Sequence, residues 1–157
     1  LRIPVMGINT LRIIAENGYR AGDWVAVAMD ARRGSVYAAL YQNSAEGLKE
    51  YWPPCYTDVE SFANRLASLN DVLICGDGGK KYQEVWGKNP QVKTGPSTWD
   101  RPSAGNLIRI AARQWLTENK DENKDLSPCY LRKVEAEARL EERMNADQSR
   151  SDEIGRP

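Results

Sequence analysis

Apolar runs separated by polar turns dominate the first half of the chain, and they predict buried β-strands. The expected strands are Trp24–Met29, Val36–Tyr41 and Leu48–Tyr56. The first two are continuously apolar, which is typical of strands buried on both faces. The turn between them contains Gly34, which tolerates a positive φ, so the pair predicts a β-hairpin. Pro53 and Pro54 lack the N–H that a strand ladder needs, so we expect the third strand at a sheet edge.

Helical spacing of apolar residues predicts four helices. They begin after Asn9 or Thr10, after a capping box of Thr57 and Glu60, at Gly79 and after Ser103. Gly18 is placed to end the first helix, and the third ends at Trp86. The stripe expected to face the core in the second helix is Val59, Phe62, Ala63 and Leu66. In the fourth helix it is Leu107, Ile108, Ala111 and Trp115.

The remaining apolar segments complete a mixed α/β pattern. The further extended pieces that we expect are Ile3–Ile8, Asp71–Gly76 and Cys129–Leu131. A sheet covered by helices therefore accounts for residues 1–132, which we take as one domain. Residues 133–157 form a charged tail, predicted to be helical over Val134–Asn145 and then disordered.

Composition excludes several kinds of site. The 157 residues contain no histidine, which removes Ser–His and Cys–His catalytic pairs and most transition-metal sites. The 22 basic and 22 acidic residues balance, so no broad nucleic-acid or membrane surface is indicated. Three widely spaced cysteines (Cys55, Cys75 and Cys129) favour a reduced, cytoplasmic protein over a disulfide scaffold. We expect neither a signal peptide nor a membrane span.

The run Gly76-Asp77-Gly78-Gly79 lies between a predicted strand and a predicted helix, where backbone N–H groups can bind phosphate. Its spacing matches neither the P-loop nor the dinucleotide-binding fingerprint. Two interpretations stay open: a nucleotide or phosphate site, and a tight turn from strand to helix, which the pattern favours.

Asp30 and Asp77 both follow predicted strands, so together they could hold Mg²⁺, which prefers oxygen ligands. The alternative is that Asp30 caps its turn and Asp77 caps the next helix, as Asp commonly does, and this is the favoured interpretation. Arg32 and Arg33 at the hairpin tip could contact phosphate or a partner carboxylate, but a solvated turn is favoured there too.

Three segments, in chain order, resemble motifs of the bacterial TsaB (YeaZ) family. Ile3–Leu11 (IPVMGINTL) resembles I-P-V-x-G-V-S-T-L, Asp30–Tyr37 (DARRGSVY) resembles D-A-R-x-G-E-V-Y, and Pro128–Arg132 (PCYLR) resembles P-x-Y-L-R. Together they extend over about residues 1–133.

The second motif puts Asp30, Arg32 and Gly34 on the family's signature turn. Ser35 stands where the family usually has Glu, which weakens any role for that position. The resemblance implies a ribonuclease-H-like lobe of the superfold shared by actin, sugar kinases and chaperone ATPases. The family's N-terminal lobe, with a D-T-S start and a G-P-G-S-F-T-G-L-R run, has no counterpart in the sequence. We therefore expect a C-terminal lobe that is either a fragment or a truncated family member.

The resemblance also implies a function. TsaB-like proteins, once called glycoprotease-like, are non-catalytic scaffold or dimerization subunits of the complex that adds a threonylcarbamoyl group to the adenosine beside the anticodon of tRNAs. The implied partners are a TsaD-like catalytic subunit and a TsaE-like ATPase; tRNA would be contacted only through the complex, and a homodimer is left open. No cofactor is implied for this chain, whereas ATP and a metal ion would belong to the partner complex. Because the contact with TsaD would lie in the N-terminal lobe, we expect these 157 residues not to replace a full-length partner.

Two other functions stay open. One is a nucleotide-binding kinase or ATPase of the same superfold, with Gly76–Gly79 near the phosphates or the base. The other is a protein-binding module that uses the charged tail. The upstream coding sequence separates the first from a scaffold, and tail deletion followed by a pull-down tests the second.

Overall fold

The computed structural model of the chain describes residues 5–117 and 126–132. The chain divides into two units, Leu1–Ser127 and Pro128–Pro157. All helices and strands given below lie in the first unit. Residues 128–132 of the second unit carry no strand, although the pattern predicts an extended piece there, and the expected helix over Val134–Asn145 lies outside the described residues.

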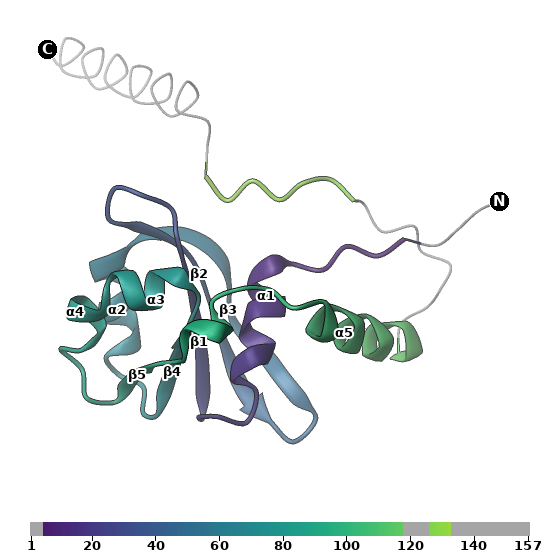
Figure 1. Ribbon diagram of the computed structural model, residues 1–157, viewed down its shortest axis with the longest axis horizontal. Coiled ribbons are helices and arrows are strands. Elements are labelled where there is room, and N and C mark those ends of the chain that lie inside the picture. Colours follow the sequence, from purple (N-terminus) through teal and green to yellow (C-terminus); the bar gives the residue numbers. More distant parts are fainter. Residues whose placement is uncertain (1–4, 118–125, 133–157) are drawn as a thin grey trace, which may run out of the picture. The chain divides into compact units, whose positions relative to one another are not determined.

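Five strands form one mixed sheet in the order β3-β2-β1-β4-β5 (Figure 1). Their bounds are β1 Trp24–Asp30, β2 Ser35–Ser44, β3 Gly47–Asp58, β4 Val72–Cys75 and β5 Val92–Thr94. The first three strands are antiparallel neighbours, and β4 and β5 run parallel to β1. The predicted hairpin is confirmed, because β1 and β2 pair along their length from Trp24 opposite Gln42 to Asp30 opposite Val36.

β3 lies at the edge of the sheet, as the two prolines predict. The register between β2 and β3 shifts between Ala38 and Leu40, and Pro53 and Pro54 are the residues opposite this irregularity. A bulge needs no ladder hydrogen bond from the residue it displaces, so the missing N–H groups cost little there.

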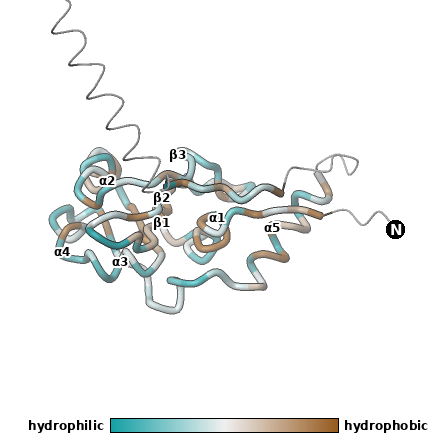
Figure 2. The backbone as a smooth tube through the Cα atoms, turned by 90° about the horizontal axis from the view of Figure 1, so that it is seen from above, coloured by the Kyte–Doolittle hydropathy of each residue, from teal (hydrophilic) through white to brown (hydrophobic). Residues whose placement is uncertain are grey.

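Helices cover both faces of the sheet. Their bounds are α1 Thr10–Ala15, continued by the 3₁₀ turn η1 Glu16–Gly18, α2 Val59–Leu66, α3 Asp77–Lys81, α4 Gln83–Trp86, the 3₁₀ turn η2 Ser97–Trp99 and α5 Ala104–Thr117. Helices α2, α3 and α4 lie on one side of the strands, and α1 and α5 lie on the other (Figure 1). Stretches of β1, β2 and α1 are among the hydrophobic, brown parts of the chain (Figure 2).

The core under α2 confirms the predicted stripe of that helix. Phe62 and Leu66 are fully buried and Val59 is 4% exposed. The Phe62 ring meets the rings of Trp52 and Trp86 edge to face, with centroids 6.3 and 6.1 Å away. Such pairs add to the free energy gained by burying apolar surface.

Helix starts follow local side chains, and one of them differs from the prediction. Asn9 caps α1 as expected, since its Oδ1 accepts the N–H of Leu11 at 2.9 Å. The predicted cap of α2 at Thr57 is wrong, because Thr57 still belongs to β3. Asp58 caps α2 instead, and its Oδ1 accepts the N–H of Ser61 at 2.8 Å.

Two boundaries around the other helices are also corrected. Gly18 does not end a helix in a left-handed conformation but lies buried in η1, where an added Cβ would touch Val25 and Cys75. The single helix expected over Gly79–Trp86 begins earlier, at Asp77, and is interrupted at Tyr82.

The expected N-terminal strand is not formed over its described part. Val5 is 56% exposed, and the residues from Val5 to Ile8 belong to none of the five strands. A continuous apolar run becomes a strand only where a neighbouring strand accepts its hydrogen bonds. Within the described residues, the sheet ends at β3 and β5, and neither of these edge strands pairs with residues 5–8.

Helix α5 begins as predicted, but the face that we expect to pack on the core is the wrong one. The Oγ of Ser103 accepts the N–H of Asn106 at 3.1 Å, which confirms the cap. Leu107, Ile108 and Trp115 are exposed by 41%, 67% and 38%, so the predicted stripe faces outward.

The buried residues of α5 are Asn106 and Ile110. The Nδ2 of Asn106 donates to the carbonyl of Ile13 at 3.3 Å and to the Oδ1 of Asn17 at 2.6 Å. A buried amide needs such partners, so these bonds to α1 and η1 set the rotation of α5 against its apolar periodicity.

Candidate functional site

The residues that the sequence singles out gather where β1 and β4 end. These strands are parallel neighbours, so their carboxyl ends lie side by side at the same end of the sheet. Asp30 is the last residue of β1, and the loop Gly76–Gly79 directly follows β4. The Oδ1 of Asp77 accepts the backbone N–H of Asp30 at 2.9 Å, which ties the loop to the hairpin.

The Asp30 carboxylate is held by three donors. The Lys81 Nζ lies 2.6 Å from Oδ2, and the Tyr82 hydroxyl and the Arg32 N–H donate to Oδ1 at 2.8 and 3.0 Å. We call Asp30, Arg32, Asp77, Lys81 and Tyr82 the Asp30 cluster. The hydrogen bond from Lys81, supported by those from Tyr82 and Arg32, lowers the pKa of Asp30.

These contacts determine what the cluster can do chemically. The bond to Asp30 raises the pKa of Lys81, while burial and then the Asp30 bond raise the pKa of Tyr82. At neutral pH, the carboxylate is therefore ionised but a weak base, and the amine is protonated and has no free electron pair with which to abstract a proton. Among the described residues there is no group of three or more His, Cys, Asp or Glu side chains that could hold a metal ion.

The glycines beside the cluster allow the loop to approach β1. Gly76 has a φ of 100°, and an added Cβ would lie 2.5 Å from the carbonyl oxygen of Ala28. A Cβ on Gly78 would lie 2.8 Å from the same oxygen. Packing thus accounts for these two glycines, and phosphate binding by the loop stays a prediction. Gly76 is the N-cap of α3 and Asp77 is its first residue, which corrects the expected cap.

The hairpin tip has an uncommon backbone. Arg32, Arg33 and Gly34 have successive positive φ values of 65°, 51° and 73°. The turn is closed by hydrogen bonds from Ser35 N to Arg32 O at 3.0 Å and from Ala31 N to Ser35 O at 2.9 Å. Two non-glycine residues in the left-handed region cost free energy, so the surrounding bonds hold the tip in one shape.

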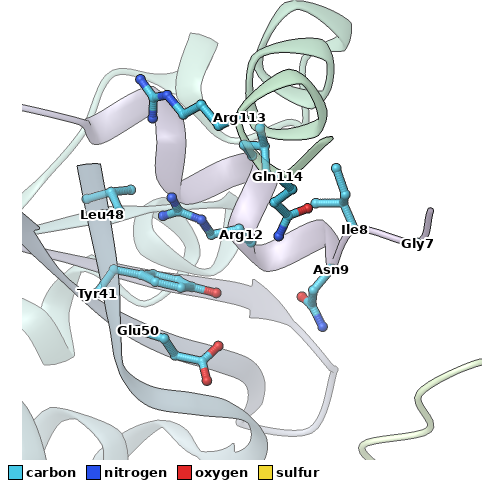
Figure 3. Close-up of a pocket in the computed structure, with 10 residues that line it drawn as sticks. Gly7, Ile8, Asn9, Arg12, Tyr41, Leu48, Glu50, Arg113 and Gln114 are labelled. Atoms are coloured by element: carbon cyan, nitrogen blue, oxygen red, sulfur yellow. The ribbon is translucent and has the colours of Figure 1, made fainter. Parts of the chain in front are cut away.

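A separate cavity of about 370 Å³ opens between α1, β2, β3 and α5; we call it the α1–α5 pocket (Figure 3). Its lining residues are Gly7, Ile8, Asn9, Arg12, Tyr41, Leu48, Glu50, Ile110, Arg113 and Gln114. Charged and amide side chains stand beside apolar ones in this wall, so a ligand there would meet groups of both kinds.

A buried carboxylate organises the helical side of this pocket. Glu16 has a fully buried side chain, and it is surrounded by the guanidinium groups of three arginines. Arg12 Nη2 is 3.3 Å from Oε2, whereas Arg113 Nη1 and Arg109 Nη1 are 3.2 and 4.0 Å from Oε1. Burial lowers the pKa of Arg12, and the attraction of Glu16 opposes this shift only in part.

The sequence predictions missed both of these arrangements. Lys81 lies 51 residues from Asp30, and no local pattern connects the two. The Glu16 group did leave a signal, because Arg12 and Glu16, like Arg109 and Arg113, are four residues apart and therefore share a helix face.

Comparison with known proteins gives a consistent result. The model of the family described as "TsaD: tRNA N6-adenosine threonylcarbamoyltransferase" matches residues 1–140. The tRNA threonylcarbamoyladenosine biosynthesis protein TsaB of Bacillus subtilis (strain 168) is 28% identical over 144 residues, which cover 88% of this chain and 60% of the relative.

Solved structures show the same likeness. YeaZ from Pseudomonas aeruginosa superposes with a TM-score of 0.64 and 26% identity, over 81% of this chain and 60% of that one. The crystal structure of an uncharacterized protein with similarity to peptidase YeaZ from Pseudomonas aeruginosa gives 0.62 and 26%, over 82% and 59%. The predicted ribonuclease-H-like fold of the actin and sugar-kinase superfold is confirmed. The chain spans about 60% of the length of these relatives. In the part of the chain that the structure describes, no helix is long and apolar enough to cross a membrane.

Proposed function

The chain belongs to the family of TsaD-type tRNA N6-adenosine threonylcarbamoyltransferases and, within it, to the TsaB (YeaZ) proteins; from this premise we propose that it acts in tRNA threonylcarbamoyladenosine biosynthesis as a non-catalytic scaffold subunit. In this proposal a TsaD-type protein carries out the chemistry, a TsaE-type ATPase joins the complex, and tRNA is contacted through the partners. The balance of 22 basic and 22 acidic residues supports the last point, because tRNA binding on its own requires an excess of positive charge.

The proposal that the subunit is non-catalytic depends on one observation, the hydrogen bonds that the Asp30 carboxylate already accepts. This carboxylate is the acidic group that the motif puts at the signature turn, and its oxygens already accept hydrogen bonds from Lys81, Tyr82 and the Arg32 N–H. A group held in this way stabilises the junction of β1 with α3. Its lowered pKa makes it a weak base, and both of its oxygens already accept hydrogen bonds.

The role in the cell is tested in the organism that encodes the chain. The chromosomal gene is tagged, the associated proteins are identified, and threonylcarbamoyladenosine in total tRNA is measured after depletion of the gene product. We expect a TsaD-type protein to co-purify and the modified nucleoside to fall. Unchanged modification, with no TsaD-type protein recovered, would contradict the proposal.

The non-catalytic role is tested by rescue of the depleted strain with variants. Asp30→Asn keeps the shape and the acceptor oxygen of the side chain, so we expect modification within about threefold of the parent. Asp58→Asn, which changes the N-cap of α2 and none of the hydrogen bonds to the Asp30 carboxylate, is the matched control. A general acid or base contributes about 10²–10⁴-fold to a rate, so a loss of that size with Asp30→Asn alone, at normal protein levels, would make Asp30 catalytic.

A further inference from the structure

The α1–α5 pocket contains two buried polar atoms that the fold leaves without partners. Within the described residues, neither the Tyr41 hydroxyl nor Arg12 Nη1 makes a hydrogen bond. Tyr41 is 0% exposed, and its hydroxyl points toward the interior of the cavity (Figure 3). Polar groups in this position are normally bonded, because burial removes them from water without compensation.

The two side chains that carry these atoms lie against each other. The guanidinium carbon of Arg12 is 5.3 Å from the centre of the Tyr41 ring, so the cation covers the aromatic face. The other arm of Arg12 is paired with Glu16, which restrains the side chain while Nη1 keeps no hydrogen-bond partner. The Arg12 side chain is 21% exposed and forms part of the pocket wall.

The charges around the pocket favour a single negative charge. Arg12, Arg109 and Arg113 carry three positive charges, and Glu16 and Glu50 supply two negative ones. Glu50 is exposed on β3, where it would repel a ligand with further negative charge. Leu48 and Ile110 are both buried and form an apolar part of the wall.

We propose that the α1–α5 pocket binds a small carboxylic acid with an apolar body. The carboxylate accepts hydrogen bonds from Arg12 Nη1 and the Tyr41 hydroxyl, and the body packs against Leu48 and Ile110. Hydrogen bonds of this kind, with a charged donor and a charged acceptor, are the stronger ones in proteins. This site is independent of the proposed scaffold function, since it involves neither the Asp30 cluster nor a TsaD-type partner.

The first test is a titration of the 157-residue chain with isovalerate and phenylacetate, followed by two-dimensional NMR of the backbone amides and by calorimetry. The matched neutral probes are isovaleramide and phenylacetamide, and phenyl phosphate tests the alternative anion. We expect shifts at α1, β2 and α5, with the amides and the phosphate at least tenfold weaker than the acids. Equal binding of acid and amide, or no shift with any probe at 10 mM, would overturn the proposal.

The second test separates binding from packing. Tyr41→Phe removes a hydroxyl that has no partner in the free protein, so we expect an unchanged or higher melting temperature together with at least tenfold weaker binding of the acid. Tyr56→Phe is the matched control, since the Tyr56 hydroxyl is bonded to Ser35 and lies outside the pocket. It should leave acid binding unchanged.

Arg12→Lys keeps the charge opposite Glu16 but loses the second arm, and we again expect at least tenfold weaker binding. If Arg12→Lys does not fold, Tyr41→Phe decides alone. Acid binding that is the same in Tyr41→Phe and in the parent would show that the hydroxyl does not contact the ligand, and a clear drop in melting temperature in that variant would show that the hydroxyl has a partner in the free protein. Either result overturns the proposal.

Discussion

Replacement of Gly76 by Ala should destabilise the protein more than the same replacement at Gly34. Both glycines have positive φ, 100° and 73°, so both substitutions strain the backbone. An added Cβ at Gly34 meets nothing within 4 Å, whereas at Gly76 it would lie 2.5 Å from the carbonyl oxygen of Ala28. The pair therefore separates conformational strain from a steric overlap with β1.

The expected magnitudes follow from these two effects. A non-glycine residue in the left-handed region costs about 1–2 kcal/mol, which is the whole effect expected for Gly34→Ala. Gly76 has ψ 157° with its φ of 100°, a region that is essentially limited to glycine and costs about 1–3 kcal/mol. The overlap with a backbone oxygen that cannot rotate away adds to this, so we expect a total above about 3 kcal/mol. Against a typical stability of about 5–15 kcal/mol, that is a large fraction.

Urea and thermal unfolding followed by circular dichroism measure both variants. At about 4 °C per kcal/mol, Gly34→Ala should lower Tm by roughly 4–8 °C and Gly76→Ala by more than about 12 °C. A loss at Gly76 equal to or smaller than that at Gly34 would refute the close packing of the glycine loop on β1. In that case the loop would be free to serve another purpose, and phosphate binding would become the better explanation of its glycines.

Three other measurements test the core, the Asp30 cluster and the glycine loop. Phe62→Ala should cost about 3–5 kcal/mol in urea unfolding, because the ring is fully buried between two tryptophans; a cost below about 1 kcal/mol would mean that α2 does not pack as described. The pKa of Asp30 is lowered in the folded state, so its contribution to stability is present above the unfolded pKa of about 3.9 and is lost as the pH falls through the folded pKa. Asp30→Asn should therefore flatten the acid side of a plot of urea midpoint against pH, and an unchanged slope would contradict this. Calorimetry should detect weak or no ATP binding to the chain, because the resemblance implies a nucleotide site formed by both lobes and the chain spans about 60% of its relative; micromolar affinity would instead favour a nucleotide-binding enzyme.

Elements with a strong local signal could be predicted from the sequence. The β1–β2 hairpin follows from two apolar runs around Gly34, and the buried face of α2 follows from the spacing of Phe62 and Leu66. β5 could not be found in this way, because it has three residues and none of them is fully buried. Its position depends on parallel pairing with β4, which is a tertiary contact.

The errors in α5 and in the site have a common physical origin. In α5, the apolar periodicity points to Leu107 and Ile108, but hydrogen bonds from Asn106 to residues about 90 positions earlier turn another face inward. In the Asp30 cluster, Lys81 reaches Asp30 from 51 residues away. Long-range polar bonds decide both cases, and spacing along the chain carries no information about them.

The Asp30 cluster and the α1–α5 pocket differ in how far their polar groups are satisfied. Asp30 accepts hydrogen bonds at both oxygens, so a ligand that approached it would have to replace bonds that already exist. Tyr41 and one arm of Arg12 have no partner within the described residues, so a ligand acceptor would form bonds there without breaking any. An unsatisfied buried group costs free energy that a bonded one does not, and a ligand recovers it. Substitution at Asp30 should therefore affect stability more than binding, and substitution at Tyr41 should affect binding more than stability.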